Sequence, residues 1–212
     1  MEIALTVLGA YLLGSVSFAI VVSRLFALPD PRTYGSNNPG ATNVLRSGSK
    51  AAAVLTLLGD GGKGWLAVFL AARITGLDLL AGPVIPLAGL AVVIGHMFPV
   101  FHRFHGGKGV ATAAGALLGF DLWLGLGILA TWAMIIAFFR ISSLAALLAA
   151  VFAPFWSFWL FGLREVTFAV LAIAVLLVWR HKENIGRLLR GEESRVGKKT
   201  SAEPPAPSAG AQ

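Results

Sequence analysis

The chain has 212 residues, of which 57% are hydrophobic and 13% are charged, and its formal net charge is +7. Soluble domains are about 45–50% apolar, so a mean hydropathy of +0.79 excludes an ordinary soluble domain and indicates an integral membrane protein. The chain contains no cysteine, which excludes disulfide bonds and thiolate chemistry.

Apolar segments alternate with polar ones along the chain, and most approach the length of about 20 residues that a membrane-spanning helix needs. A segment in the hydrocarbon layer must satisfy its own backbone hydrogen bonds, so we expect every one to be helical. The first has Glu2 as its only early charge and is interpreted as a retained helix rather than a signal peptide. The apolar segments cover residues 2–23, 51–72, 79–101, 110–139, 144–161 and 163–179.

The basic residues predict how these helices are oriented. Residues 24–50 carry four Lys or Arg and residues 180–199 carry seven, so both regions should be cytoplasmic. Six crossings would place them on opposite sides of the membrane. Segment 110–139 is long for one span and is interrupted at residues 119–121. Splitting it gives about seven transmembrane helices, some short or broken, with the N-terminus outside and the C-terminus cytoplasmic; five crossings also fit.

The composition changes after the last apolar segment. Residues 180–193 are strongly polar, and from Thr200 the chain reads "TSAEPPAPSAGAQ". Such a Pro/Ala/Ser-rich stretch has too few large apolar residues to build a core. We therefore predict one all-α membrane-embedded domain over residues 1–199 and a disordered tail over residues 200–212.

Four polar stretches fall on the predicted cytoplasmic side, at residues 30–46, 102–112, 140–143 and 180–193. The second contains "GGKG" directly before an apolar segment. Glycine turns leave backbone N–H groups free to converge on an anion, and the start of a helix adds partial positive charge. Arg46 adds a planar donor suited to phosphate. This face is therefore interpreted as a site for one or more phosphorylated ligands.

The residues of these polar stretches also have purely structural interpretations. Glycines at helix ends are often only caps, and "GGKG" lacks the Walker spacing, which argues against a nucleotide hydrolase. His181 and Asn184 share one helix face, although basic residues after a last helix are often topological anchors. His96 is expected to be packed or interfacial.

A second "GGKG" string lies inside an apolar segment, at residues 61–64. Asp60 and Lys63 are three residues apart there, so an internal ion pair is expected. We interpret "DGGKG" as a helix break that supports the site, and assign the chemistry to residues 106–109.

Taken in order, the motifs resemble those of the bacterial acyl-phosphate:glycerol-3-phosphate acyltransferases, the PlsY-type enzymes. The resemblance spans residues 1 to about 196, and five motifs in sequence with consistent spacing make it specific. They are "GSVSFA" at 14–19, "GSNNPGATNVLR" at 35–46, "DGGKG" at 60–64, "GHMFPVFHRFHGGKGVAT" at 95–112 and "RHKENIGRLLRGEE" at 180–193.

The resemblance implies a transferase of phospholipid biosynthesis in the bacterial inner membrane, with its active site facing the cytoplasm. It would move a fatty acyl group from acyl phosphate to the 1-hydroxyl of sn-glycerol 3-phosphate, giving lysophosphatidic acid and phosphate. It implies no cofactor, no metal, no nucleic acid and no obligatory protein partner; the partners are the two substrates and the lipid bilayer.

The resemblance also assigns roles to individual residues. Lys108, His181 and Arg46 are expected to be catalytic, with the hydroxyl proton passing either to His181 or to a phosphate oxygen. Glu193 is expected to pair with a basic residue and hold the tail, as structural support with Asp60 and Lys63. The expected substrate-binding residues are Ser36, Thr42, Asn43, Gly106, Gly107, Gly109, Thr112, Ser143 and Asn184.

A membrane transporter of phosphate or a phosphorylated metabolite is the alternative function. Transporters also combine cationic residues with broken helices, but they place them near the bilayer midplane and show internal repeats. Here the polar stretches gather at one face, and no repeat is visible beyond the two "GGKG" strings.

Overall fold

The computed structural model describes residues 2–196, which are all-helical and contain no strand. This confirms the predicted all-α membrane fold; the predicted tail at 200–212 lies outside the described residues. The α-helices are α1 (Glu2–Gly14), α2 (Phe18–Leu25), α3 (Ala41–Val44), α4 (Lys50–Thr75), α5 (Val84–Met97), α6 (Val110–Phe120), α7 (Leu122–Phe139), α8 (Ser142–Phe161), α9 (Glu165–Arg180) and α10 (Lys182–Leu189). The described residues also form two 3₁₀ helices, η1 (Leu45–Ser47) and η2 (Val100–His102).

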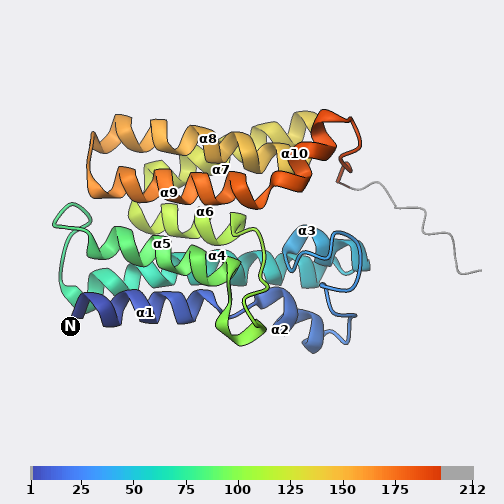
Figure 1. Cartoon of the computed structure of the whole chain (residues 1–212), viewed down its shortest axis with the longest axis horizontal. Coiled ribbons are helices and arrows are strands. Elements are labelled where there is room, and N and C mark those ends of the chain that lie inside the picture. The colour runs from blue at the N-terminus through green and yellow to red at the C-terminus, as the bar shows by residue number, and fades with distance from the viewer. Residues whose placement is uncertain (1, 197–212) are drawn as a thin grey trace, which may run out of the picture.

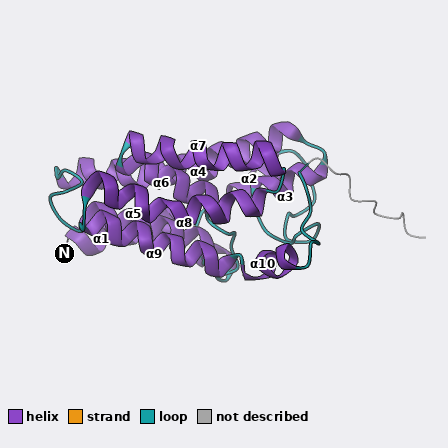
Figure 2. Ribbon diagram, turned by 90° about the horizontal axis from the view of Figure 1, so that it is seen from above, coloured by secondary structure: helices purple, strands orange, loops and turns teal. Residues whose placement is uncertain are grey.

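The long helices lie side by side in one bundle (Figure 1), which seen from above consists of helices joined by loops (Figure 2). Within residues 2–196, five segments are long and apolar enough to cross a membrane: Glu2–Leu25, Lys50–Thr75, Val84–His102, Leu122–Phe139 and Ser142–Phe161. The shorter α6 and α9 lie alongside them (Figure 1). The seven crossings and their orientation stay a prediction.

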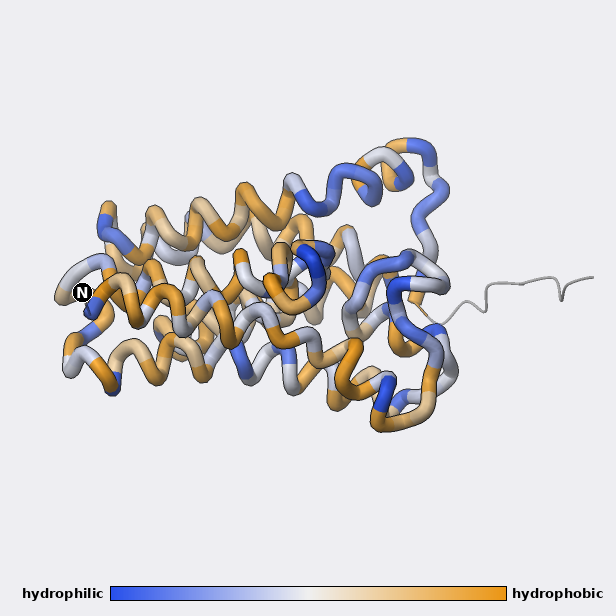
Figure 3. Tube along the Cα trace, turned by 60° about the horizontal axis from the view of Figure 1, so that its bottom comes forward, coloured by the Kyte–Doolittle hydropathy of each residue, from blue (hydrophilic) through white to orange (hydrophobic). Residues whose placement is uncertain are grey.

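The two ends of the bundle differ in polarity. One end carries the N-terminus and the loop between α4 and α5, and the other carries α2, α3 and α10 (Figure 1). Hydrophilic residues gather on α10 and in the loops near it (Figure 3). We call this second end the polar end.

The predicted interruption of segment 110–139 is present. Helix α6 ends at Phe120 and α7 begins at Leu122. Asp121 between them is extended, with a φ of −157°, and its side chain accepts a hydrogen bond from the backbone N of Leu124 at 2.9 Å. An aspartate in this position caps the new helix because it satisfies an N–H group that has no intrahelical partner.

The first apolar segment differs from the single helix predicted for it, because it is broken between α1 and α2 at residues 15–17. A break within a membrane segment leaves backbone carbonyls without their helical partners, which is costly in lipid. The Nζ atom of Lys63, on α4, donates a hydrogen bond to the carbonyl oxygen of Val16 at 2.5 Å. A lysine on a neighbouring helix thus supplies the hydrogen-bond donor that this carbonyl lacks at the break.

The helix break predicted at "DGGKG" is wrong, because α4 runs without interruption from Lys50 to Thr75. The glycines instead let α4 and α6 approach closely. A methyl group on Gly64 would lie 2.1 Å from the carbonyl oxygen of Thr112, and one on Gly115 would lie 1.8 Å from that of Gly61. The predicted ion pair is confirmed, with Lys63 Nζ 2.8 Å from Asp60 Oδ1.

Candidate active site

A cavity of about 420 Å³ opens at the polar end. Its walls are formed by the loop before α3, by residues 106–109 before α6, which we call the glycine turn, and by the junction of α9 with α10. Four of its residues are cationic and one, Glu183, is anionic, a balance that favours an anionic ligand. Its lining residues are Ser36, Asn37, Asn38, Gly106, Lys108, Trp179, Arg180, Lys182, Glu183 and Arg187.

Lys108 is held in the cavity by a chain of hydrogen bonds that ends at Glu193. Its Nζ donates to Oδ1 of the buried Asn184, whose Nδ2 donates to Glu193 Oε1 at 2.6 Å. Ser143 donates to the same oxygen at 2.7 Å, and Arg187 Nε donates to Glu193 Oε2 at 2.6 Å. Glu193 therefore makes the predicted contact with a basic residue, and Ser143 supports Glu193 instead of lining the cavity.

Burial shapes the electrostatics of this chain of contacts. It lowers the pKa of Lys108 to about 8, against the opposing effect of the Glu193 carboxylate. Burial alone would raise the pKa of Glu193, but hydrogen bonds from Ser143, Asn184 and Arg187 hold that pKa below its usual value. At neutral pH the lysine is therefore a cation and the glutamate an anion.

His181 lies just beyond α9 and does not line the cavity. It is 3% exposed, and its Nδ1 is 2.7 Å from the carbonyl oxygen of Leu177. A carbonyl can only accept, so Nδ1 carries the hydrogen and Nε2 keeps its lone pair. Burial lowers the pKa of His181 to about 4, which leaves the ring neutral at neutral pH.

The loop before α3 is shaped by Asn43. This buried side chain donates through Nδ2 to the carbonyl oxygens of Pro31 at 2.7 Å and Tyr34 at 3.1 Å, and its Oδ1 accepts from the backbone N of Ser36 at 3.0 Å. Both amide hydrogens are thus used, which argues against its predicted role as a donor to substrate; Asn43 positions Ser36 instead. Thr42 is exposed and does not line the cavity.

Arg46 lies outside the cavity lining and is exposed. Its Nη2 donates to Ser194 Oγ at 2.8 Å, which joins the first loop to the chain that follows α10. Its side chain also lies against Gly35, where a methyl group would be 3.1 Å from Arg46 Nη1. The arginine thus lies beside Gly35. The prediction that Arg46 and His181 act together with Lys108 in the site is not supported, because neither of them lines the cavity.

The glycine turn is held by two neighbours. Arg180 donates through Nη2 to the carbonyl oxygen of Gly106 at 2.8 Å and through Nε to that of Gly107 at 3.2 Å. The N–H of Gly107 donates to the carbonyl oxygen of His96 at 3.1 Å. This amide is used within the protein, which contradicts its predicted role as a free donor to the substrate. Gly109, with a φ of +82°, caps α6, whose first N–H groups have no intrahelical partner and point out of the helix.

Thr112 is buried between the helices and does not line the cavity. Its Oγ1 lies 3.1 Å from His96 Nδ1, which is in turn 3.4 Å from Asp60 Oδ1. The sequence pattern predicts neither this partnership nor the hydrogen bonds from Arg180 to the glycine turn. A signal for the partnership existed, because an aspartate and a histidine in apolar segments both need buried partners.

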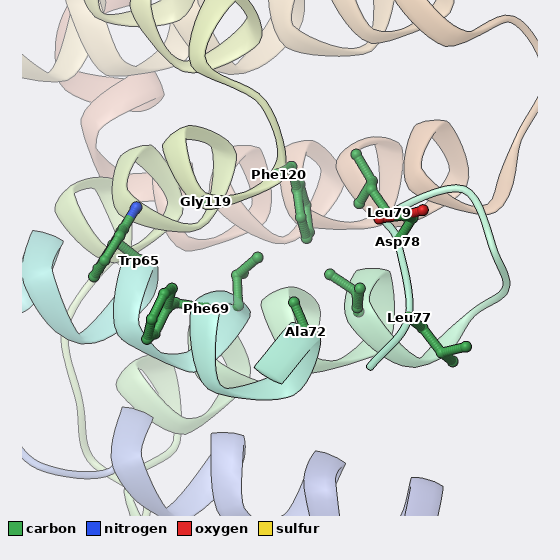
Figure 4. A pocket seen from close by; sticks show the side chains of 10 residues that line it. Trp65, Phe69, Ala72, Leu77, Asp78, Leu79, Gly119 and Phe120 are labelled. Atoms are coloured by element: carbon green, nitrogen blue, oxygen red, sulfur yellow. The ribbon is translucent and has the colours of Figure 1, made fainter. Parts of the chain in front are cut away.

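A second cavity, of about 320 Å³, lies at the other end of the bundle. Aromatic and aliphatic side chains of α4 and α6 line it, with Asp78 as the charged residue (Figure 4). Because it offers no cation, it does not suit a phosphate, and the polar end remains the candidate site.

Comparisons with known proteins show which family the chain is similar to. The family model described as glycerol-3-phosphate acyltransferase matches residues 4–191. A glycerol-3-phosphate acyltransferase of Cupriavidus taiwanensis is 60% identical over 192 residues, covering 91% of this chain and 95% of the relative. One from Ralstonia pickettii is 60% identical over 199 residues, covering 92% and 94%.

Two crystal structures are also similar, both of PlsY (YgiH), an integral membrane glycerol 3-phosphate acyltransferase. The glycerol 3-phosphate form has a TM-score of 0.86 and 39% identity, covering 93% of this chain and 96% of the other. The lysophosphatidic acid form has a TM-score of 0.84 and 38% identity, covering 92% and 95%. The family model, the relatives and the shared fold together establish that this chain belongs to the glycerol-3-phosphate acyltransferase family.

Proposed function

We propose that the protein transfers a fatty acyl group from an acyl phosphate to the 1-hydroxyl of sn-glycerol 3-phosphate, releasing lysophosphatidic acid and phosphate, as the first step of bacterial phospholipid synthesis. The observation that carries the proposal is the cavity lined by four cations beside apolar helices. Both substrates carry a phosphate, and the acyl donor also carries a fatty chain that can lie in lipid.

The chemistry needs positioning and charge stabilisation more than a reactive side chain. An acyl phosphate is already activated, so the glycerol hydroxyl can attack its carbonyl carbon directly, forming the new ester bond while the bond to the phosphate oxygen breaks. Lys108 and the N–H groups at the start of α6 are suited to stabilise the charge on the leaving phosphate. Ser36, which also lines the cavity, is suited to bind glycerol 3-phosphate.

The hydroxyl proton has two candidate acceptors. His181 has a free Nε2, but with a pKa of about 4 it is a weak base, and it does not line the cavity. A phosphate oxygen of a substrate is a stronger base near neutral pH and is brought to the reacting hydroxyl by the substrate itself. These properties support the phosphate as proton acceptor, with His181 as a neutral support for the end of α9.

The proposed location is the bacterial inner membrane, with the cavity on the cytoplasmic side. The cavity lies at the polar end, to which the basic residues of the first loop and of α10 both belong. An excess of Lys and Arg marks the cytoplasmic face of membrane proteins.

The experiment combines the purified full-length protein with palmitoyl phosphate and glycerol 3-phosphate, and follows phosphate and lysophosphatidic acid together. Equal amounts of both products are expected, and neither without glycerol 3-phosphate. If neither product forms, the proposed reaction is wrong. If phosphate appears without lysophosphatidic acid, the protein hydrolyses the donor instead. A parallel reaction with palmitoyl-CoA tests the donor, because an equal rate would remove the acyl phosphate from the proposal.

A further inference from the structure

A cluster of buried polar side chains lies below the candidate site, within the membrane-spanning helices. Asp60, Lys63, His96 and Thr112 are 2%, 3%, 7% and 0% exposed, respectively, and none of them lines the cavity. Burying polar and charged groups away from water is costly unless they have partners. The position of this cluster therefore calls for a role that apolar residues could not fill.

The cluster joins three helices through a single imidazole ring. Nδ1 of His96, on α5, lies 3.1 Å from Thr112 Oγ1 on α6 and 3.4 Å from Asp60 Oδ1 on α4. Asp60 is fixed in turn by Lys63, 2.8 Å away. The ring thus has a hydrogen-bonding partner on α6 and a carboxylate oxygen 3.4 Å away on α4, and these two contacts set its orientation.

The other side of His96 supports the glycine turn. Its carbonyl oxygen accepts the N–H of Gly107 at 3.1 Å. A methyl group on Gly107 would lie 2.2 Å from His96 Nε2, and one on Gly106 would lie 2.1 Å from the His96 carbonyl oxygen. The turn is therefore folded directly onto this histidine, and glycine is the residue that fits there.

We propose that Asp60, His96 and Thr112 are positioning residues, which fix the glycine turn and through it the place of Lys108 in the cavity. Lys108 follows Gly107 directly and stands four residues before Thr112, which lies in the first turn of α6. The role rests on the proposed function of Lys108, and it goes beyond that function because no member of this cluster touches the cavity.

The test compares two variants that each remove one buried hydroxyl. Thr112→Val deletes the bond to His96. Ser157→Ala deletes a bond of the same 3.1 Å length, to Thr167, between α8 and α9 and away from the glycine turn. A displaced catalytic group costs activity steeply, so kcat/KM for glycerol 3-phosphate should fall between about tenfold and a hundredfold in Thr112→Val and stay within about twofold in Ser157→Ala. Thermal unfolding in detergent shows whether both remain folded.

A second measurement separates positioning from loss of stability. At high pH, kcat/KM should fall as Lys108 loses its proton; we call this fall the alkaline limb of the pH profile. When Lys108 is no longer held against Asn184, it is less buried and its pKa rises. The alkaline limb should therefore move to higher pH in Thr112→Val and stay in place in Ser157→Ala. Asp60→Asn, which keeps the shape of the side chain, should shift the limb in the same direction.

The proposal is overturned if folded Thr112→Val keeps the wild-type kcat/KM and the wild-type limb. It is also overturned if Thr112→Val and Ser157→Ala lose activity equally, in step with their unfolding temperatures. A wild-type protein that transfers no acyl group would instead refute the proposed function, so the two failures are distinguishable.

Discussion

Lys108 supplies the charge that the proposed reaction needs, and burial makes this charge depend on pH within the working range. Its pKa is lowered to about 8, so the charged form dominates at pH 7 and is lost above pH 8. A single group with this pKa is about 90% protonated at pH 7 and about 10% protonated at pH 9. We therefore expect kcat/KM for glycerol 3-phosphate to fall about tenfold between these two pH values.

The assay measures initial phosphate release from pH 6 to pH 10, at saturating acyl phosphate and low glycerol 3-phosphate. A blank without glycerol 3-phosphate removes spontaneous hydrolysis of the donor. The charged groups that act on Lys108 are Glu193, Arg187, Glu183 and Arg180. Lys108→Arg is the control, because a guanidinium stays charged throughout this pH range. The variant should show no fall of kcat/KM at high pH, even if its kcat/KM is lower at every pH.

Protein stability should move in the opposite direction. Because the pKa of Lys108 is lower in the folded protein than in the unfolded chain, the unfolded chain binds more protons between pH 8 and the ordinary lysine pKa. This site therefore contributes a free energy of unfolding that rises with pH in that window. The assignment of the activity loss to deprotonation of Lys108 would be contradicted if the protein unfolds over the same pH range. It would also be contradicted if kcat/KM stays constant to pH 10, or if Lys108→Arg shows the same fall at high pH.

Three further predictions concern other residues. Gly115→Ala should lower the free energy of unfolding by about 3 kcal/mol, because its methyl group meets the backbone of α4. Thermal unfolding measures this, with Gly62→Ala as the control, which has open space around it and should not lose stability. Arg180→Gln should lower kcat/KM more than about tenfold in the phosphate-release assay, because the glycine turn loses its clamp. His181→Gln should keep near-normal kcat at saturating glycerol 3-phosphate if a phosphate oxygen accepts the proton, and a complete loss of turnover with binding intact would count against that route.

The sequence was sufficient for features that depend on local composition. Apolar length predicts the long helices, and an aspartate between two apolar stretches predicts the interruption at Asp121. The spacing of Asp60 and Lys63 predicts their ion pair, because residues three apart lie on one helix face. The basic and glycine-rich motifs identify the polar end of the bundle, since both are visible without knowing which helices are neighbours.

Features that depend on the neighbouring helix were out of reach. The glycines around Lys63 suit a helix break and a close helix contact equally well, and only the position of α6 decides between them. Asn43 has the chemistry of a substrate donor, but its hydrogens are used by its own loop. The hydrogen bonds from Arg180 to the glycine turn could not be predicted, because its carbonyl partners lie 73 and 74 residues away in sequence.

The bond between Lys63 and Val16 has a consequence for membrane insertion. The two residues are 47 positions apart, and translation delivers the N-terminal segment to the bilayer before α4 has been made. Until Lys63 arrives, a break at Val16 would expose an unpartnered carbonyl to lipid, which costs several kcal/mol. We therefore expect the nascent segment Glu2–Leu25 to insert as one continuous helix. It would bend into α1 and α2 only when α4 docks beside it.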